Sequence, residues 1–235
     1  MMVRLEDVSK GYGSGANAIR ALDQVSLGVG SGEFIVLTGP SGSGKTTLLN
    51  LIGGLTRPDH GQILVAGQDL LAMPDAELSH FRGRSIGFVF QFQSMLPTLT
   101  ALDNVRLPRR FAGGPDDEPG ARELLAAVGL ADRAGAYVHE LSAGQQRRVG
   151  IARALVNKPA LLLCDEPTGD LDPDTEAVIM AMIAKANREG ATVLMTTHNQ
   201  ALSSYASRSL RLEDGRLLDT GTKINYKINQ GETSN

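Results

Sequence analysis

The hydrophobic residues of the chain follow two patterns. Near the N-terminus, Val3 and Leu5, and later Val25, Leu27 and Val29, alternate with polar or small residues. This period of two indicates half-buried antiparallel strands. Further along, four short runs are almost wholly apolar, as expected of parallel strands that helices cover on both faces. These runs span residues 34–38, 86–90, 161–164 and 192–197.

Helical periodicity occupies much of the sequence between the apolar runs. Strands that alternate with helices predict an α/β fold with a mainly parallel sheet, to which the first strands add an N-terminal antiparallel β subdomain. The predicted helices cover residues 45–52, 121–128, 143–156 and 175–188.

Residues 92–157 contain no strand pattern, which predicts an inserted α-helical subdomain. We therefore expect a single domain. Residues 1–91 and 158–221 form its core and β subdomain, and a polar tail at 222–235 is expected to fray.

Two turn signals punctuate this plan. Asp214-Gly215 separates the segments 209–213 and 216–218, which is a strong local signal for a β-hairpin. The segment 111–120 is rich in Gly, Pro and Asp, and it is the best candidate for a mobile loop.

Composition and charge narrow the class of protein. The chain has 235 residues, 42% of them hydrophobic, and a formal net charge of -3, so no overall basic field exists to hold nucleic acid. Every apolar run is far shorter than the roughly 20 residues needed to cross a bilayer, so contact with a membrane would need a partner. The single cysteine, Cys164, forms no internal disulfide, and residues 1–7 lack a signal peptide, which predicts a cytoplasmic protein.

A phosphate-binding motif follows the first apolar run and opens a predicted helix. Its glycines let backbone N–H groups converge on phosphates, and the helix N-terminus adds a positive end. Lys45 would reach the β- and γ-phosphates of ATP, and the Thr46 hydroxyl would bind Mg²⁺. The alternative is a Gly-rich turn with a solvated lysine. The motif consists of Gly39, Pro40, Ser41, Gly42, Ser43, Gly44, Lys45 and Thr46, and we include the next residue, Thr47.

Two acids, Asp165 and Glu166, close the buried run 161–164, at the sheet edge where α/β folds bind ligands. We expect Asp165 to hold magnesium through its hydration shell and Glu166 to act as general base toward the attacking water. An acidic pair before Pro167 that merely begins a loop is the alternative.

His198 follows the run 192–197 at the same edge of the sheet, where an imidazole can contact the γ-phosphate. His60, His80 and His139 lack such a setting, and we expect surface or structural roles for them. Cys164 has no metal-ligand spacing around it and is expected to be a small buried residue.

One further stretch indicates a family. It runs Leu141-Ser-Ala-Gly-Gln-Gln-Arg-Arg-Val-Gly-Ile-Ala-Arg-Ala-Leu155, upstream of the acidic pair. This stretch resembles the signature motif of ABC ATPases, and the resemblance covers nearly the whole chain. It implies a P-loop NTPase core of the RecA-like type, ATP and Mg²⁺ as cofactors, and ATP hydrolysis.

The resemblance also implies roles for further residues. Tyr12 lies where the family keeps an aromatic that stacks on adenine, and Gln91 lies where its Q-loop contributes to catalysis and to the metal. Residues 169–172 resemble the D-loop, and His198 resembles the switch histidine. By this resemblance Lys45, Gln91, Glu166 and His198 are catalytic, Thr46, Gln91 and Asp165 bind the metal, and Ser142, Ala143, Gly144 and Gln145 bind nucleotide.

The start of the signature stretch also has a physical interpretation. Ser142 and Gln145 form an S-x-x-Q capping box at the start of an amphipathic helix. A capped helix start is an anion site, and the P-loop already supplies one, so the second is best used by ATP on another subunit. Capping for stability alone, worth about 1 kcal/mol, is the alternative. The family arrangement implies a homodimer on ATP binding.

Ala143 is a departure from the family pattern, which usually has glycine there. A methyl group so near a γ-phosphate is expected to weaken activity without abolishing it, because Ser142, Gly144 and Gln145 are retained.

Finer resemblances lie in residues 91–105 and 165–169, which look like the branch that serves lipoprotein release, macrolide export and peptide-antibiotic resistance. This implies transmembrane permease subunits as partners and a place on the inner face of the cell membrane, without direct insertion. Arg82, Arg84, Met95 and Leu96 either line the groove for a partner's cytoplasmic helix or are ordinary surface and core residues.

Two main hypotheses of function follow from these motifs. The first is an ATPase whose dimer cycle moves membrane partners, and the second is an ATP-dependent regulator of a membrane or cell-wall partner without transport. A small-molecule kinase is disfavoured because it predicts no capped signature helix. A DNA-repair ATPase is disfavoured because there is no zinc insertion, long coiled coil or basic face.

Overall fold

The computed structural model describes residues 1–14, 19–91, 95–169 and 171–223. The expected polar tail falls outside these ranges from residue 224 onward, and so does position 170 of the D-loop.

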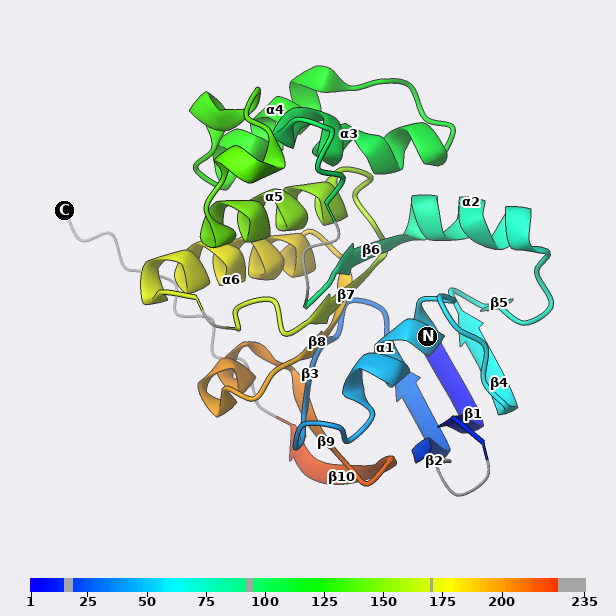
Figure 1. Ribbon diagram of the computed structural model, residues 1–235. Coiled ribbons are helices and arrows are strands. Elements are labelled where there is room, and N and C mark those ends of the chain that lie inside the picture. The colour runs from blue at the N-terminus through cyan, green and yellow to red at the C-terminus, as the bar shows by residue number, and fades with distance from the viewer. Residues whose placement is uncertain (15–18, 92–94, 170, 224–235) are drawn as a thin grey trace.

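The described strands form two sheets (Figure 1). The smaller sheet is antiparallel, has the order β2-β1-β4-β5, and carries the alternating pattern seen in the sequence. Its strands are β1 (Val3–Tyr12), β2 (Ile19–Val29), β4 (His60–Val65) and β5 (Gln68–Asp69).

The larger sheet has the order β10-β9-β3-β8-β7-β6, in which all neighbours pair in parallel except the β9-β10 hairpin. That hairpin turns at Asp214-Gly215, as the sequence predicts. The strands are β3 (Phe34–Thr38), β6 (Ile86–Val89), β7 (Leu161–Asp165), β8 (Thr192–Thr196), β9 (Arg208–Glu213) and β10 (Arg216–Lys223).

Helices lie on both sides of the larger sheet (Figure 1). Helix α1 lies between the two sheets and contacts β2, β4, β7 and β8, whereas α5 and α6 contact β6 and β8. The helices are α1 (Lys45–Ile52), α2 (Asp75–Ser85), α3 (Ala101–Phe111), α4 (Glu118–Ala127), α5 (Ala143–Leu155) and α6 (Pro173–Arg188), with short 3-10 helices η2 (Ala131–Arg133), η3 (Val138–Glu140) and η4 (Gln200–Tyr205).

The larger sheet separates two hydrophobic cores. Along β3, Phe34 and Val36 join the core under α5 and α6, while Ile35 and Leu37 join the core shared with α1 and the smaller sheet. Successive side chains of a strand point to opposite faces, so a fully apolar strand serves both cores. The predicted fold class, a mainly parallel α/β core with an antiparallel β subdomain, is confirmed.

The segment 111–120, predicted as a mobile loop, is shorter and more structured than expected. Helix α4 begins at Glu118, capped by Asp117, whose side chain accepts from Gly120 N at 3.0 Å. The loop prediction was wrong at this end because Asp117 is a good N-cap and Pro119 lies in the first turn, where proline is compatible with a helix.

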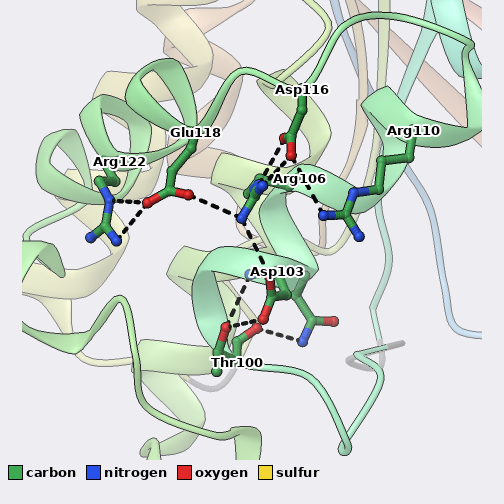
Figure 2. Close-up of polar contacts among 8 residues, drawn as sticks. Thr100, Asp103, Arg106, Arg110, Asp116, Glu118 and Arg122 are labelled. Carbon is green, nitrogen blue, oxygen red and sulfur yellow. Dashed lines mark hydrogen bonds and ion pairs between the residues drawn. The ribbon is translucent and has the colours of Figure 1, made fainter.

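An ionic cluster centred on Arg106 holds the remaining loop against α3 (Figure 2). The Arg106 guanidinium, only 14% exposed, forms hydrogen bonds with Asp116 and lies 3.2 Å from Glu118 and 3.6 Å from Asp103. The hydrogen bond from Arg106 is the main cause that holds the pKa of Asp116 below its ordinary value. The cluster therefore joins α3, the loop and the first turn of α4.

We expect Arg106→Gln to lower thermal stability at neutral pH. Asp116 has a lowered pKa in the folded state. Its ion pair with Arg106 therefore contributes fully to the free energy of unfolding above the ordinary Asp pKa, and this contribution is lost as the pH falls through the lowered pKa of the folded state. The melting temperatures of parent and variant should therefore converge in strong acid. Arg122→Gln removes only an exposed pair with Glu118 and serves as the control, with little expected effect. Equal melting temperatures for the Arg106 variant and the parent at neutral pH would contradict this prediction.

Candidate nucleotide site

The Gly39–Thr46 loop is shaped by backbone conformations that favour glycine. Gly44 has a φ of 104°, and a Cβ added there would lie 2.2 Å from Ala21 O. Gly39 has a φ of 148°, and its Cβ would lie 2.1 Å from Leu212 O. The loop leads into α1, whose N-terminus has no side-chain cap, so its backbone N–H groups remain available to an anion.

Lys45 lies folded against this loop. Its Nζ donates to Gly39 O and Pro40 O, both at 2.9 Å, and the residue is 7% exposed. The buried Ser43 Oγ has no hydrogen-bond partner among the described residues. A buried cation beside a buried hydroxyl without a partner fits a phosphate group, which accepts hydrogen bonds from both.

The predicted metal ligands lie side by side. Thr46 Oγ1 donates to Asp165 Oδ2 at 2.7 Å, and Thr196 Oγ1 donates to Asp165 Oδ1 at 2.6 Å. Thr46, Asp165 and Gln91 line one cavity of about 400 Å³. A hydroxyl, a carboxylate and an amide are oxygen donors of the kind that Mg²⁺ prefers, so the residues fit that ion.

Glu166 follows β7 in a strained backbone conformation, with a φ of 46°. Its backbone N donates to Thr196 Oγ1 at 3.0 Å, and His198 N donates to its Oε2 at 3.3 Å. His198 Nδ1 lies 3.1 Å from Oε1, which accepts no well-aligned hydrogen bond within the described part of the chain. The carboxylate therefore keeps one acceptor for the proton of a water molecule.

Burial raises the pKa of the Glu166 carboxyl above its ordinary value, and electrostatic interactions with His198 and Lys45 oppose that shift. A raised pKa makes a carboxylate a stronger base at neutral pH.

The remaining predicted residues lie at the edges of this site or away from it. Tyr12 is 45% exposed at the end of β1, with Lys10 Nζ 5.6 Å from the centre of its ring. The predicted nucleotide-binding residues of the signature stretch stand at the start of α5, and none of them lines the cavity beside Thr46. They are Ser142, Ala143, Gly144 and Gln145.

The signature helix begins as predicted. Ser142 Oγ accepts from Gln145 N at 3.2 Å, and Gln145 Oε1 accepts from Ser142 N at 2.9 Å, which completes the capping box. Ser142 and Ala143 are exposed, so this helix start is accessible to another molecule.

The histidines and the cysteine that were expected to lie outside the site do so. His60 and His80 are exposed, and the ring of His139 stacks on Tyr137 at 5.9 Å. Cys164 is fully buried in the core, and burial raises the pKa of its thiol, which makes it unreactive.

Two residues of the site were missed in the sequence. Thr196, which bonds both Asp165 and Glu166, lies within a predicted strand and was counted only for its place in that strand. Arg147 belongs to the signature stretch, but its side chain reaches the ends of β6 and β7, which only the fold brings near. The available signal for Thr196 was a polar residue at the C-terminal end of a buried strand.

Arg82, Arg84, Met95 and Leu96 were expected either to line a partner's groove or to be ordinary surface and core residues. Arg82 is one of the residues that line a cavity of about 560 Å³ between α2, β6, α3 and α5. Arg84 lies elsewhere, with Nε donating to Ala112 O at 3.2 Å, Met95 packs against the core, and Leu96 is 45% exposed outside this cavity.

The sequence matches the family described as ABC transporter over residues 22–169, more than half of the chain. The chain belongs to the ABC transporter family. It is an ATP-binding cassette that hydrolyses ATP, as the sequence resemblance implied.

Similar proteins place the cassette within the family. It is 47% identical to the lipoprotein-releasing system ATP-binding protein LolD of Geobacter metallireducens over 220 residues, 92% of this chain and 98% of the relative. It is 39% identical to the macrolide export ATP-binding/permease protein MacB of Chlorobaculum tepidum, over 97% of this chain but 35% of that protein. These relatives confirm the predicted lipoprotein-release and macrolide-export type.

A solved structure has the same fold as this cassette. A dimeric structure of the ATP-binding cassette MJ0796, described as a post-hydrolysis state bound to ADP and Pi, superposes with a TM-score of 0.89 at 38% sequence identity. The match covers 96% of this chain and all of that one.

Proposed function

We propose that two copies of this chain close around ATP, hydrolyse it and thereby move transmembrane permease subunits at the inner face of the cell membrane. The observation that carries the proposal is the meeting of Lys45, Thr46, Asp165, Glu166 and His198 at one edge of the larger sheet. The dimeric state of the MJ0796 cassette supports the pairing of two copies.

Each residue has a distinct task in this proposal. Lys45 and the N-terminus of α1 bind the phosphates, and Glu166 takes a proton from the attacking water through its Oε1. His198, fixed beside Glu166, orients toward the γ-phosphate, and Tyr12 stacks on adenine. Thr46, Asp165 and Gln91 hold Mg²⁺, which when bound offsets negative charge on the phosphate oxygens.

The partner copy supplies the start of its signature helix. Ser142 of α5 is exposed at an N-terminus that favours anions, and it does not line the cavity beside Thr46 in its own chain. Two copies packed head to tail would place each signature helix on the other copy's nucleotide. In this proposal neither chain holds a complete site alone.

We expect Ala143→Gly to raise the ATPase kcat by about two- to tenfold, a smaller effect than the roughly hundredfold that a misplacement of about 1 Å can cost at a reacting site. The methyl group of Ala143 stands at the exposed first turn of α5, where it limits close approach of the partner's nucleotide. Phosphate release under saturating ATP measures the effect. An unchanged rate would remove the inferred role of this methyl group.

The groove between α2, β6, α3 and α5 supports contact with a permease. Phe88, Phe90, Leu107 and Phe111 line it, and Phe111 is 71% exposed, an unusual position for a large apolar side chain. No helix within the described residues is long and apolar enough to span a membrane. The printed name of MacB, to 35% of which this chain is similar, joins ATP-binding and permease functions, which supports a permease as the partner.

Purification from solubilised membranes tests the membrane role. We expect the tagged full chain to carry a multi-spanning membrane protein with it, and Phe111→Glu to lose that protein while keeping basal ATPase activity. Leu218→Glu, at an exposed apolar position on β10, serves as the matched control and should retain the partner. Recovery of the parental chain without a membrane protein, or retention by Phe111→Glu, would contradict the proposal.

A further inference from the structure

Arg147 connects the signature helix to the ends of two strands that carry the nucleotide site. It lies in the second turn of α5, and its Nη1 donates to Gln91 O at 2.8 Å and to Phe90 O at 3.2 Å. The same nitrogen lies 3.4 Å from Glu166 O, at the limit of hydrogen-bond distance. These carbonyl groups belong to the segments that leave β6 and β7, which are adjacent parallel strands.

The carbonyls at the ends of parallel strands need donors, since no further strand residues follow to pair with them. Charge-assisted hydrogen bonds from a guanidinium are stronger than those between neutral groups. One cation that reaches both strand ends therefore restrains the distance between them.

Glu166 is the residue for which this restraint matters most. A non-glycine residue at a φ of 46° keeps that conformation only where its surroundings hold it. Its N donates to Thr196, and its O accepts from Gly169 N at 3.2 Å and lies next to Arg147. Of the three residues that make these contacts with Glu166, only Arg147 belongs to the helical part of the chain, residues 92–157.

We propose that Arg147 is a positioning residue for ATP hydrolysis, which holds the backbones of Gln91 and Glu166 in place relative to the signature helix. It acts through those two residues and touches no substrate. The proposal rests on the proposed roles of Gln91 and Glu166. If Arg147 acts in this way, any movement of α5 that follows closure on ATP is transmitted to Gln91 and Glu166.

The next residue along the helix provides a matched control. Arg148 carries the same charge, but its Nη1 donates to Val128 O at 2.9 Å, at the C-terminal end of α4 and within the helical part of the chain. Both arginines bind backbone carbonyls from α5. They differ in that only Arg147 reaches the strand ends of the nucleotide site.

The experiment measures ATPase kcat and KM on the full chain. We expect Arg147→Gln to lower kcat by about tenfold with KM for ATP changed by less than about twofold, since a cationic donor is lost but the phosphate-binding residues are not. Arg147→Lys should regain most of the loss, because the contacts with Phe90 O, Gln91 O and Glu166 O come from one nitrogen and an ammonium offers three donors. Arg147→Met, which keeps the length of the stem without the charge, should behave like Arg147→Gln, and Arg148→Gln should match the parent.

Several results would overturn the inference. These are a kcat for Arg147→Gln within twofold of the parent, an equal loss in Arg148→Gln, and a failure of Arg147→Lys to exceed Arg147→Met. Glu166→Gln, measured alongside, separates this inference from the proposed function. An inactive Glu166→Gln with a fully active Arg147→Gln rejects the positioning role alone, whereas an active Glu166→Gln rejects the role of Glu166 and with it this inference.

Discussion

We expect Glu166→Gln to lower the ATPase kcat by about a thousandfold, within the range that general bases contribute, while ATP affinity stays within about threefold of the parent. The substitution preserves size but removes the carboxylate whose Oε1 is buried without a well-aligned hydrogen bond. Phosphate release and titration with a fluorescent nucleotide measure the two quantities.

Glu189→Gln, at the C-terminal end of α6, is the matched control and should behave as the parent. The pH profile offers a second check. Because burial raises the pKa of Glu166, the parental kcat should fall as the pH drops through that raised value, where the base becomes protonated. Parental turnover by Glu166→Gln would remove the general-base role.

The second large effect is expected at Lys45. Lys45→Ala should weaken ATP binding by about a hundredfold, because the cation pairs with phosphates in a buried setting where charge-assisted hydrogen bonds are strong. Its ammonium is already held by Gly39 O and Pro40 O at the mouth of the loop, so little ordering is needed on binding. Equilibrium nucleotide titration measures the loss, and Lys185→Ala on the exposed side of α6 is the control. Unchanged affinity in Lys45→Ala would show that phosphate binding does not depend on this residue.

Much of the site could be predicted because its residues are local in sequence. The loop 39–46 and the pair Asp165-Glu166 follow buried strands, and parallel strands end at a common sheet edge. The capping box at Ser142 is likewise a local pattern, and the structure shows both of its hydrogen bonds. Short-range patterns of this kind do not require knowledge of tertiary contacts.

Other features depend on contacts between distant segments. Arg147 and Gln91 are 56 positions apart, and Thr196 and Asp165 are 31 apart, so no local pattern indicates their bonds. Helix α2 was missed because Leu78 is its only buried residue, so it lacks an apolar face. Helix α3 had a usable signal in Thr100, which caps Asp103, but Pro108 and its many charged residues hid the helical period.

Two copies of the chain share each nucleotide in this mechanism, one through Lys45 and the other through Ser142. Sedimentation of the Glu166→Gln chain with Mg-ATP is the experiment that tests this sharing, because blocked hydrolysis should trap the closed state. We expect a species of twice the 24.9 kDa chain mass with ATP and a single chain without it. Adding Ser142→Ala should weaken that dimer while ATP still binds to the separate chains. If the Glu166→Gln chain binds ATP to saturation and still sediments as a single chain at high concentration, two copies do not share the nucleotide.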